Sequence, residues 1–169
     1  MKYRIRTASL SDIEAMYRIS LAAHNLPLYA RLIPSEYRQR FDERYSDNKE
    51  QRELFFQKTI DLLTHPGVRF FVAEDDQGLI GYVGVQWQCK DLVVMRGLFV
   101  HPAKQGQGVG SQLLTYLLER VGPVRIELKV LRGNDRARML YVRFDFHEVG
   151  TSEAQYFGAQ QAVMARSAY

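Results

Sequence analysis

The sequence is poor in cysteine and has no long apolar run. Its 169 residues include one cysteine, Cys89, which excludes an intrachain disulfide framework and a thiolate-rich zinc or iron–sulfur site. No apolar run reaches the ~18 residues that a membrane span needs, and residues 1–10 lack the apolar core of a signal peptide. The 4 histidines show no metal-ligand spacing, so we predict no metal site. These absences favour a cytoplasmic protein without a membrane partner.

The composition is otherwise that of an ordinary globular domain. Hydrophobic residues make up 46% and charged residues 25% of the chain, and the length predicts one domain, residues 1–169. The net charge is +4, and residues 125–143 alone hold six bases and two acids. This basic stretch suits an anionic ligand, or it is a solvated face. RNA binding is an alternative that no recognition motif or arginine-rich tail supports, so we expect no nucleic-acid partner.

The N-terminal part of the chain is predicted to be one strand followed by three helices. Residues 2–7 alternate in polarity as a strand does. Ser11 and Glu14 fit the capping box of the first helix. A second helix starts near Pro34, a first-turn residue that needs no partner for a backbone N–H, and a third spans about residues 49–63.

Strands dominate the rest of the chain, with two further helices between them. Alternation and turn signals predict the strands, and apolar stripes at helical spacing predict the helices. The predicted strands are residues 68–74, 79–88, 92–100, 124–130, 146–149 and 160–166, and the predicted helices are residues 111–121 and 134–144. The whole order is β-α-α-α-β-β-β-α-β-α-β-β, which predicts an α+β fold around a mixed sheet.

The loop after the strand that ends at Val100 carries the clearest functional signal. Gly106, Gly108 and Gly110 lie in this loop, and a helix begins at its end, near Ser111. A helix N-terminus has free backbone N–H groups and a partial positive charge, and glycines let the backbone approach a phosphate closely. Residues 105–111 are therefore predicted to hold a phosphate-bearing ligand.

Two common phosphate-binding motifs do not fit this loop. A P-loop needs a lysine directly after its last glycine, and Ser111 stands there. A dinucleotide-binding G-x-G-x-x-G motif matches at Gly106 and Gly108 but again meets Ser111 at its third glycine position. Too little chain follows the loop for the long sheet that this second motif normally opens.

The segment from Gln105 to Gly110 instead resembles the Q/R-x-x-G-x-G/A acyl-CoA loop of the GNAT N-acetyltransferase superfamily. The strand end at 98–100, followed by Pro102, is similar to that family's fourth strand. The family's N-x-x-A-x-x-F-Y-x-x-x-G-F helix pattern is matched by Asn134, Ala137, Leu140, Tyr141 and Phe146. Asp145 replaces its glycine. We expect this position to end the helix with a positive φ, which Asp tolerates better than most residues.

The resemblance implies a mostly antiparallel sheet flanked by helices and acetyl-CoA as co-substrate, with no metal. The backbone of Leu98, Phe99 and Val100 would pair with the pantetheine arm, and Asn134 would contact that arm. The Val100 N–H, at a strand bulge, would stabilise the oxyanion, and Tyr141 would be the general acid to the CoA thiolate. The residues expected at the pyrophosphate are Gln105, Gly106, Gln107, Gly108, Val109, Gly110 and Ser111.

The function implied is direct transfer of an acetyl group from acetyl-CoA to a primary amine: a small amine, a polyamine or a protein amine. A non-catalytic acyl-CoA sensor and an RNA-binding domain are the alternatives. Residues 28–37 weakly resemble bacterial spermidine/spermine acetyltransferases, which makes Glu36 and Tyr37 candidate acceptor contacts. Tyr37, Phe41 and Tyr45 form a stripe that is either core or a wall of the acceptor cleft.

Several points stay open at this stage. The general base is a water or one of several residues, none favoured, and the length of the acyl group is undetermined. The oligomeric state is also open, with a homodimer as one option. The basic residues from Arg132 to Arg138 are an unspecific candidate site for the 3′-phosphate of CoA. The candidate bases are Asp91, Glu36, Asp42, Glu43 and His101.

Overall fold

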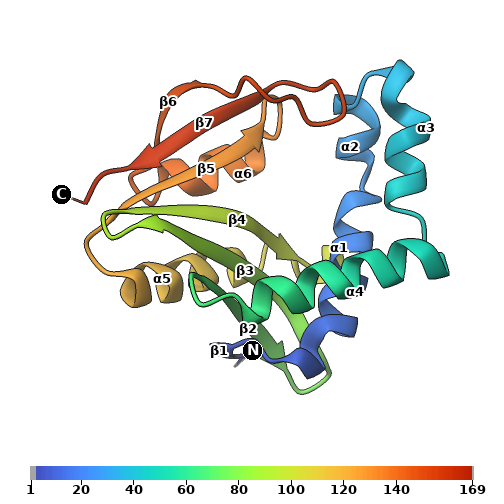
Figure 1. Ribbon diagram of the computed structural model, residues 1–169. Helices are drawn as coiled ribbons and strands as arrows, with labels where there is room; N and C mark the ends of the chain where they lie inside the picture. Colours follow the sequence, from blue (N-terminus) through green and yellow to red (C-terminus); the bar gives the residue numbers. More distant parts are fainter. Residues whose placement is uncertain (1–2, 169) are drawn as a thin grey trace.

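The computed structural model describes residues 3–168, and within them the strands form one seven-stranded sheet (Figure 1). The strand order is β1-β2-β3-β4-β5-β7-β6, and all neighbours are antiparallel except β4 and β5, which are parallel. The strands are β1 (Arg4–Thr7), β2 (Val68–Asp75), β3 (Gly78–Cys89), β4 (Leu92–Val100), β5 (Arg125–Leu131), β6 (His147–Thr151) and β7 (Gln161–Arg166).

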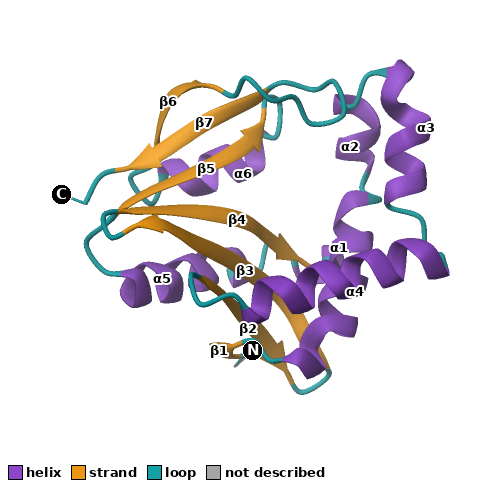
Figure 2. Cartoon of the chain, viewed as in Figure 1, coloured by secondary structure: helices purple, strands orange, loops and turns teal. Residues whose placement is uncertain are grey.

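Helices cover both faces of this sheet (Figure 2). On one face α1 packs on β3 and β4 and α4 packs on β2, while α5 packs on β2, β3 and β4 from the other face. No helix in residues 3–168 is long and apolar enough to cross a membrane. The helices are α1 (Ile13–His24), α2 (Pro27–Leu32), α3 (Ser35–Arg44), α4 (Lys49–Thr64), α5 (Val109–Val121) and α6 (Asp135–Val142).

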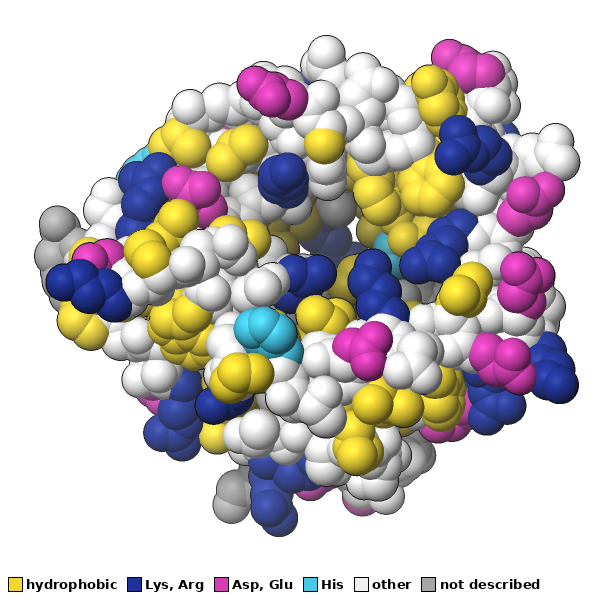
Figure 3. All heavy atoms as spheres, viewed as in Figure 1, with side chains coloured by type: hydrophobic (Ala, Val, Ile, Leu, Met, Phe, Trp, Pro, Cys, Tyr) yellow, Lys and Arg dark blue, Asp and Glu magenta, His cyan; other side chains and the backbone are white. Residues whose placement is uncertain are grey.

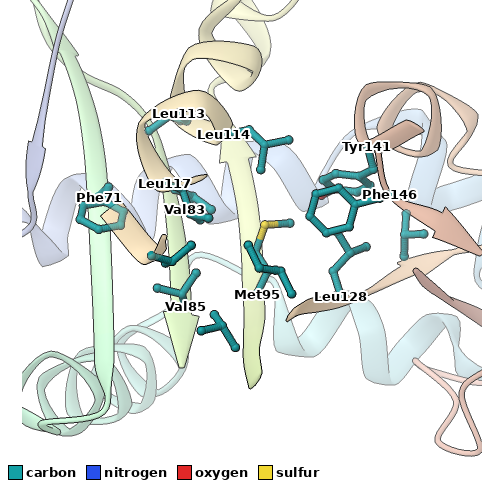
Figure 4. Packing of buried hydrophobic residues seen from close by; sticks show 14 of the residues in the cluster. Phe71, Val83, Val85, Met95, Leu113, Leu114, Leu117, Leu128, Tyr141 and Phe146 are labelled. Carbon is teal, nitrogen blue, oxygen red and sulfur yellow. The ribbon is translucent and has the colours of Figure 1, made fainter. Parts of the chain in front are cut away.

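The sheet separates two layers of apolar packing. In β2, Phe71 belongs to the cluster under α5, whereas its neighbours Phe70 and Val72 belong to the cluster under α1 and α4. This follows from the two-residue period of a strand. Figure 4 shows leucines of α5 over β3 and β4, with Tyr141 and Phe146 continuing the same layer over β5. The buried α5 leucines are Leu113, Leu114 and Leu117.

The parallel pair β4–β5 is short and then opens. Residues 92–94 pair with residues 125–127, and beyond them Figure 1 shows the two strands diverging. The His101 N–H points toward β3 and donates to the Ile80 carbonyl at 2.9 Å. The backbone N–H groups of successive strand residues point alternately toward one neighbouring strand and the other. The N–H groups of Leu98 and Val100 therefore point away from β3, into the opening between β4 and β5.

A β-bulge lies in the middle of β4. Gly84 pairs with Gly97 and Val85 with Met95, so Arg96 has no partner on β3. Such an extra residue re-aims the side chains that follow it. Met95 packs under α5, while Phe99 packs under α1 on the opposite face. We had expected the bulge at Val100; the structure corrects this, because the register changes at Arg96.

The predicted α+β fold with a mixed, mostly antiparallel sheet is confirmed, with one helix added. Helix α2 was not predicted because its six residues are too few to show an apolar period. Two of its residues, Tyr29 and Leu32, pack on a small cluster that includes Ile33 and Phe41. The element order is therefore β-α-α-α-α-β-β-β-α-β-α-β-β.

The start of α1 differs from the expected capping box at Ser11 and Glu14. The box is formed two residues earlier, where the Ser9 N–H donates to the Asp12 carboxylate at 2.8 Å. Arg6 binds the same carboxylate at 2.7 Å and holds the pKa of Asp12 down at about 2. Glu14 is left to pair with arginines on α1 and α4. Ser9 and Asp12 have the same three-residue spacing as Ser11 and Glu14. The ion pair between Arg6 and Asp12 favours the box at Ser9.

Candidate active site

Two cavities meet where β4 and β5 separate. The loop-side cavity, of about 720 Å³, lies between the end of β4, the N-terminus of α5 and the start of α6. The helix-side cavity, of about 630 Å³, lies between α1, α3, α4 and the splayed strands. Figure 3 shows a hollow on the face where α1, α3 and α4 lie. Both cavities share the lining residues Tyr29, Leu98, Phe99, Asn134, Ala137 and Tyr141.

The N-terminus of α5 forms one wall of the loop-side cavity. Gly108 caps the helix with a φ of 83°, and Gly106 has a φ of 80°, values that other residues rarely adopt. The first bond of this turn runs from the Gln112 N–H to the Gly108 carbonyl at 3.0 Å. The N–H groups of residues 109–111 precede it and so lack helical partners, which makes this end of α5 an anion site.

Gly110 is needed for close packing rather than for a special φ. A Cβ atom there would lie 3.3 Å from a Leu140 methyl and 3.5 Å from a Leu98 methyl. The helix therefore sits close against both β4 and α6. This contact holds the free N–H groups of α5 beside the open edge of β4.

Gln105 ties the loop to its surroundings. Its side-chain amide donates to the Val100 carbonyl at 3.1 Å, and its carbonyl oxygen accepts from Arg136 at 2.8 Å. Gln107 closes the loop on itself through a 3.1 Å bond to the Ala103 carbonyl. The side chains of both glutamines are used in bonds that hold the loop in shape. The groups left to bind an anion are therefore the backbone N–H groups at the start of α5.

Tyr141 lies at the junction of the two cavities. Its ring is buried, packs against Phe146 at 5.9 Å (Figure 4) and lines both cavities. Burial raises the pKa of its phenol above the ordinary value, so the group stays protonated at neutral pH. The residue lines both cavities, so its hydroxyl is a candidate donor to a ligand bound in either one.

Asn134 begins α6 beside Tyr141. Its side-chain oxygen accepts from the Ala137 N–H at 3.3 Å and caps the helix, and the residue lines both cavities. The Asn134 amide N–H₂ group stays free to donate within the described chain. At the other end of this segment, Asp145 has a φ of 63°, which confirms the positive φ expected there.

A buried histidine in the helix-side cavity was missed by the sequence analysis. His24 stacks on Tyr45 with ring centres 3.8 Å apart, and its Nδ1 donates to the Ser20 carbonyl at 2.7 Å. Burial lowers the pKa of His24 to about 4, so the ring is neutral and its Nε2 is a hydrogen-bond acceptor. The sequence held no signal for this, because Tyr45 and Phe99 reach the ring from distant segments.

The aromatic stripe of α3 is divided between core and cavity. Phe41 is buried in the core, and Tyr45 lines the helix-side cavity, where its hydroxyl is hydrogen-bonded to that of Tyr156. Tyr37 packs against the loop at Gly158, and Glu36 is exposed on the first turn of α3. Neither Glu36 nor Tyr37 lines a cavity, so the structure does not place these two candidate contacts at the site.

The candidate bases are also outside the helix-side cavity. Asp91 is exposed at the far end of β4 beside Lys90, and His101 accepts from the Ala103 N–H with its Nδ1. The remaining candidates, Glu36, Asp42 and Glu43, lie on the exposed side of α3. No Asp or Glu within residues 3–168 lines this cavity.

Half of the basic side chains in residues 125–143 form ion pairs. Arg132 and Arg138 both bind Glu148, at 2.5 and 2.9 Å, and Arg125 binds Glu127 at 2.8 Å. Lys129, Arg136 and Arg143 form no ion pair within residues 3–168, so the positive charge of this stretch is only partly neutralised. The cations that line the loop-side cavity are Arg31, Lys104, Arg136 and Arg143.

The central part of the chain matches a family model. Residues 66–148, from the turn before β2 to β6, match the model of the acetyltransferase (GNAT) domain. The chain carries a GNAT acetyltransferase domain. This segment contains the open end of β4, the α5 loop and Tyr141. The GNAT resemblance inferred from the loop is thereby confirmed. The protein is an acyltransferase, and acetyl-CoA is the acyl donor that GNAT enzymes use.

Solved structures show the same fold over the whole chain. The PaiA N-acetyltransferase from Thermoplasma acidophilum, solved in complex with coenzyme A, has a TM-score of 0.77 and 20% identity, with 99% of each chain covered. The ribosomal-protein-S18-alanine N-acetyltransferase from Escherichia coli has a TM-score of 0.71 and 20% identity, covering 98% of this chain and 93% of that chain. An N-acetyltransferase from Staphylococcus aureus Mu50 has a TM-score of 0.71 and 17% identity over the full length of both chains. A search of curated proteins found no significant match.

Proposed function

We propose that this protein transfers an acetyl group from acetyl-CoA directly to a primary amine. The observation that carries the proposal is the meeting of two cavities under Tyr141, one with an anion site and one with an aromatic wall. A donor in the loop-side cavity and an acceptor in the helix-side cavity would bring their reacting atoms together at the end of β4. Direct transfer in a ternary complex needs this geometry and no acyl-enzyme.

The loop-side cavity fits acetyl-CoA through backbone groups. The free N–H groups of residues 109–111 suit the pyrophosphate, and the open backbone of Leu98 to Val100 suits the amides of the pantetheine arm. The amide N–H₂ group of Asn134 is a further donor beside that arm. When bound, acetyl-CoA supplies an activated acetyl thioester.

Two groups of the chain would act on the reacting atoms. The Val100 N–H, which points into the opening, donates to the oxyanion that develops on the acetyl carbonyl. The Tyr141 hydroxyl donates to the sulfur as the carbon–sulfur bond breaks. A buried phenol is a weaker acid than a thiol of pKa about 8.5, so Tyr141 stabilises the thiolate through a hydrogen bond and keeps its own proton. The proton that the amine loses as the amide forms then neutralises the thiolate, which leaves as the CoA thiol.

The amine must be neutral when it attacks. An amine of pKa ~10.4 is about one part in a thousand free base near pH 7.4, which costs ~4 kcal/mol. The helix-side cavity lowers this cost because it is apolar and lined by positive charge, both of which disfavour an ammonium ion. The Nε2 of neutral His24 can accept a hydrogen bond from the amine and orient its lone pair.

The proposal is tested by binding and turnover measured together. Acetyl-CoA at about 100 times its Kd adds about 2.7 kcal/mol of stability, which raises the Tm of a domain of this size by roughly 5–10 °C. NAD and ATP serve as controls that should give no such rise. Release of the CoA thiol is then followed with a panel of amines, and acetylated product is identified by mass spectrometry.

The outcomes separate the proposal from its alternatives. A rise in Tm with acetyl-CoA and amine-dependent thiol release support acetyl transfer. The same rise in Tm, with no product from any amine, supports a non-catalytic acyl-CoA sensor. No rise with acetyl-CoA at millimolar concentration means that the loop-side cavity is not a donor site.

A further inference from the structure

Four basic side chains from four different elements line the helix-side cavity. Arg44 comes from α3, Lys58 from α4, Arg96 from β4 and Lys129 from β5. Figure 3 shows dark blue side chains around the hollow on this face. Residues that are far apart in the sequence therefore bring like charges to one cavity, where they repel one another unless an anion binds between them.

These cations have no acidic partners within residues 3–168. None of the four forms an ion pair; Arg44 donates to the neutral Gln51 at 3.3 Å, and Arg96 donates to the neutral Gln86. Some arginines elsewhere on the sheet are paired, as Arg132 and Arg138 are with Glu148. At this cavity, all four basic side chains lack an ion-pair partner within the described chain.

The positive charges of three of these residues, Arg44, Lys58 and Arg96, lie close enough to repel one another. Partial desolvation lowers the pKa of Lys58, and the positive charges of Arg44 and Arg96 lower it further. The acid one turn along α4, Asp61, does not relieve this, because it is exposed, binds Gln57 and makes no ion pair with Lys58. A bound anion would relieve this repulsion.

Arg96 lies on the face of β4 that borders the helix-side cavity. It directly follows Met95, and successive side chains of a strand point to opposite faces. Met95 faces the α5 layer, whereas Arg96 lines the helix-side cavity. This face of β4 therefore places a guanidinium where an acceptor would lie, and guanidinium groups bind carboxylates and phosphates through two donors.

The donor does not need these cations. The phosphates of acetyl-CoA are served by the N-terminus of α5 and by the separate cations of the loop-side cavity, among them Arg31 and Arg143. The rest of the lining of the helix-side cavity is mostly apolar and aromatic, including Phe55 and Leu62 of α4, with a few neutral polar side chains such as Gln51. The site is therefore suited to a small molecule with an apolar body and a negative end.

We infer that the acceptor is an amine that also carries an anionic group, a carboxylate or a phosphate, held by Arg44, Lys58 and Arg96 while its amine lies under Tyr141. This inference rests on the proposed function and names its acceptor class. It argues against a polyamine, because a second ammonium group would face like charges with no carboxylate to balance them.

The first experiment compares matched amines. CoA release is measured with 4-aminobutyrate, butylamine and 1,4-diaminobutane, which share one carbon chain and differ in the charge at its end. Leucine against leucinamide tests an α-carboxylate, and O-phosphoethanolamine against ethanolamine tests a phosphate. We expect kcat/KM to be at least about tenfold higher for the anionic member of a pair, a difference that corresponds to about 1.4 kcal/mol.

The second experiment removes the charges. Arg44→Gln, Lys58→Gln and Arg96→Gln each should raise KM for the preferred anionic amine by about tenfold and leave KM for acetyl-CoA within about twofold. The matched control is Arg40→Gln, one turn earlier on α3 and exposed outside the cavity, which should change neither value. Arg96→Glu should invert the order of 4-aminobutyrate and 1,4-diaminobutane.

Binding is measured in parallel so that the acceptor class is tested even without turnover. The same amines are titrated by NMR into the protein saturated with CoA. A preference for anionic amines that the three Gln variants abolish supports the inference, with or without product. Equal or better use of butylamine or 1,4-diaminobutane, unchanged in the Gln variants, overturns it. Binding of anionic amines without product overturns only the proposed function.

Discussion

At the residue scale, Tyr141 is the side chain on which the proposed chemistry depends most. It is the one reactive hydroxyl that both the sequence pattern and the two cavities identify, and burial keeps it protonated. Its neighbours Phe146 and Leu128 pack the ring in place, as Figure 4 shows. The hydroxyl can therefore be removed with little change in packing.

We predict that Tyr141→Phe lowers kcat by about ten- to a thousandfold, within the range of acid–base groups, and leaves KM for acetyl-CoA nearly unchanged. The reason is that the hydroxyl acts on the sulfur only as the thioester breaks. The measurement is steady-state thiol release, with Tm as the check on folding. The control is Tyr116→Phe, which removes a hydroxyl from the α5 surface beside Arg120.

The result that would remove Tyr141 from this role is an unchanged kcat when single-turnover kinetics show that chemistry is rate-limiting. A lower kcat for Tyr116→Phe of similar size would show that hydroxyl loss acts through stability rather than through the site. The two variants together therefore separate a chemical role from a structural one.

At the element scale, the N-terminus of α5 combines free backbone N–H groups, which suit a phosphate, with open space beside Gly108. Gly108 has a φ of 83° and an open surrounding, with only the Tyr3 hydroxyl within 4 Å of an added Cβ. A side chain at this position would thus enter the loop-side cavity with backbone strain but without a clash. Backbone strain at such a position costs roughly 1–2 kcal/mol.

We predict that Gly108→Glu abolishes the binding of acetyl-CoA while the protein stays folded, because it places a carboxylate where the pyrophosphate would bind. Calorimetry gives the Kd, and thermal unfolding gives the stability. The matched control is Gly122→Glu at the other end of α5, which has a φ of 72° and nothing within 4 Å of an added Cβ. It carries the same charge away from the cavity and at least as much backbone strain, because the ψ of Gly122 is −162°, in a region that essentially only glycine adopts.

Normal affinity for acetyl-CoA in folded Gly108→Glu would contradict the assignment of this loop to the donor. Equal loss of affinity in both variants would show that backbone strain or net charge, rather than the position of the carboxylate, is responsible.

At the scale of the whole molecule, the sheet consists of two parts joined by a short parallel contact. Only residues 92–94 and 125–127 pair between β4 and β5 in the described chain, while β2–β3 and β3–β4 pair along most of their length. The opening beyond this contact is the place where both cavities meet. A ligand that adds hydrogen bonds to β4 would act as an additional strand between the two parts.

We predict that the amides of Leu98 and Val100 exchange hydrogen rapidly in the free protein and slowly with acetyl-CoA, because they point into the opening. The amide of His101 bonds to Ile80 and should exchange slowly in both states. Hydrogen exchange with NMR detection resolves single amides and is the measurement. Unchanged exchange at Leu98 and Val100 under saturating acetyl-CoA would contradict the proposed donor pose.

The family resemblance and the order of the elements could be predicted from the sequence because their signals are local. The glycines from Gly106 to Gly110, the apolar stripe of α5 and the positive φ at Asp145 each depend on a few neighbouring residues. Helix α2 escaped because it is short and is stabilised by packing around Phe41. The capping box at Ser9 escaped because Arg6 selected it over the similar pattern at Ser11.

The sequence by itself predicts where a phosphate could bind and which tyrosine the proposed function uses at the thioester, since both follow from one loop and one helix. Only the tertiary structure decided the character of the acceptor cavity. Arg44, Lys58 and Arg96 meet there because α3, α4 and β4 converge, and Glu36 falls outside because its side of α3 faces solvent. The charge of a cavity is a sum over distant segments, which no local pattern in the chain contains.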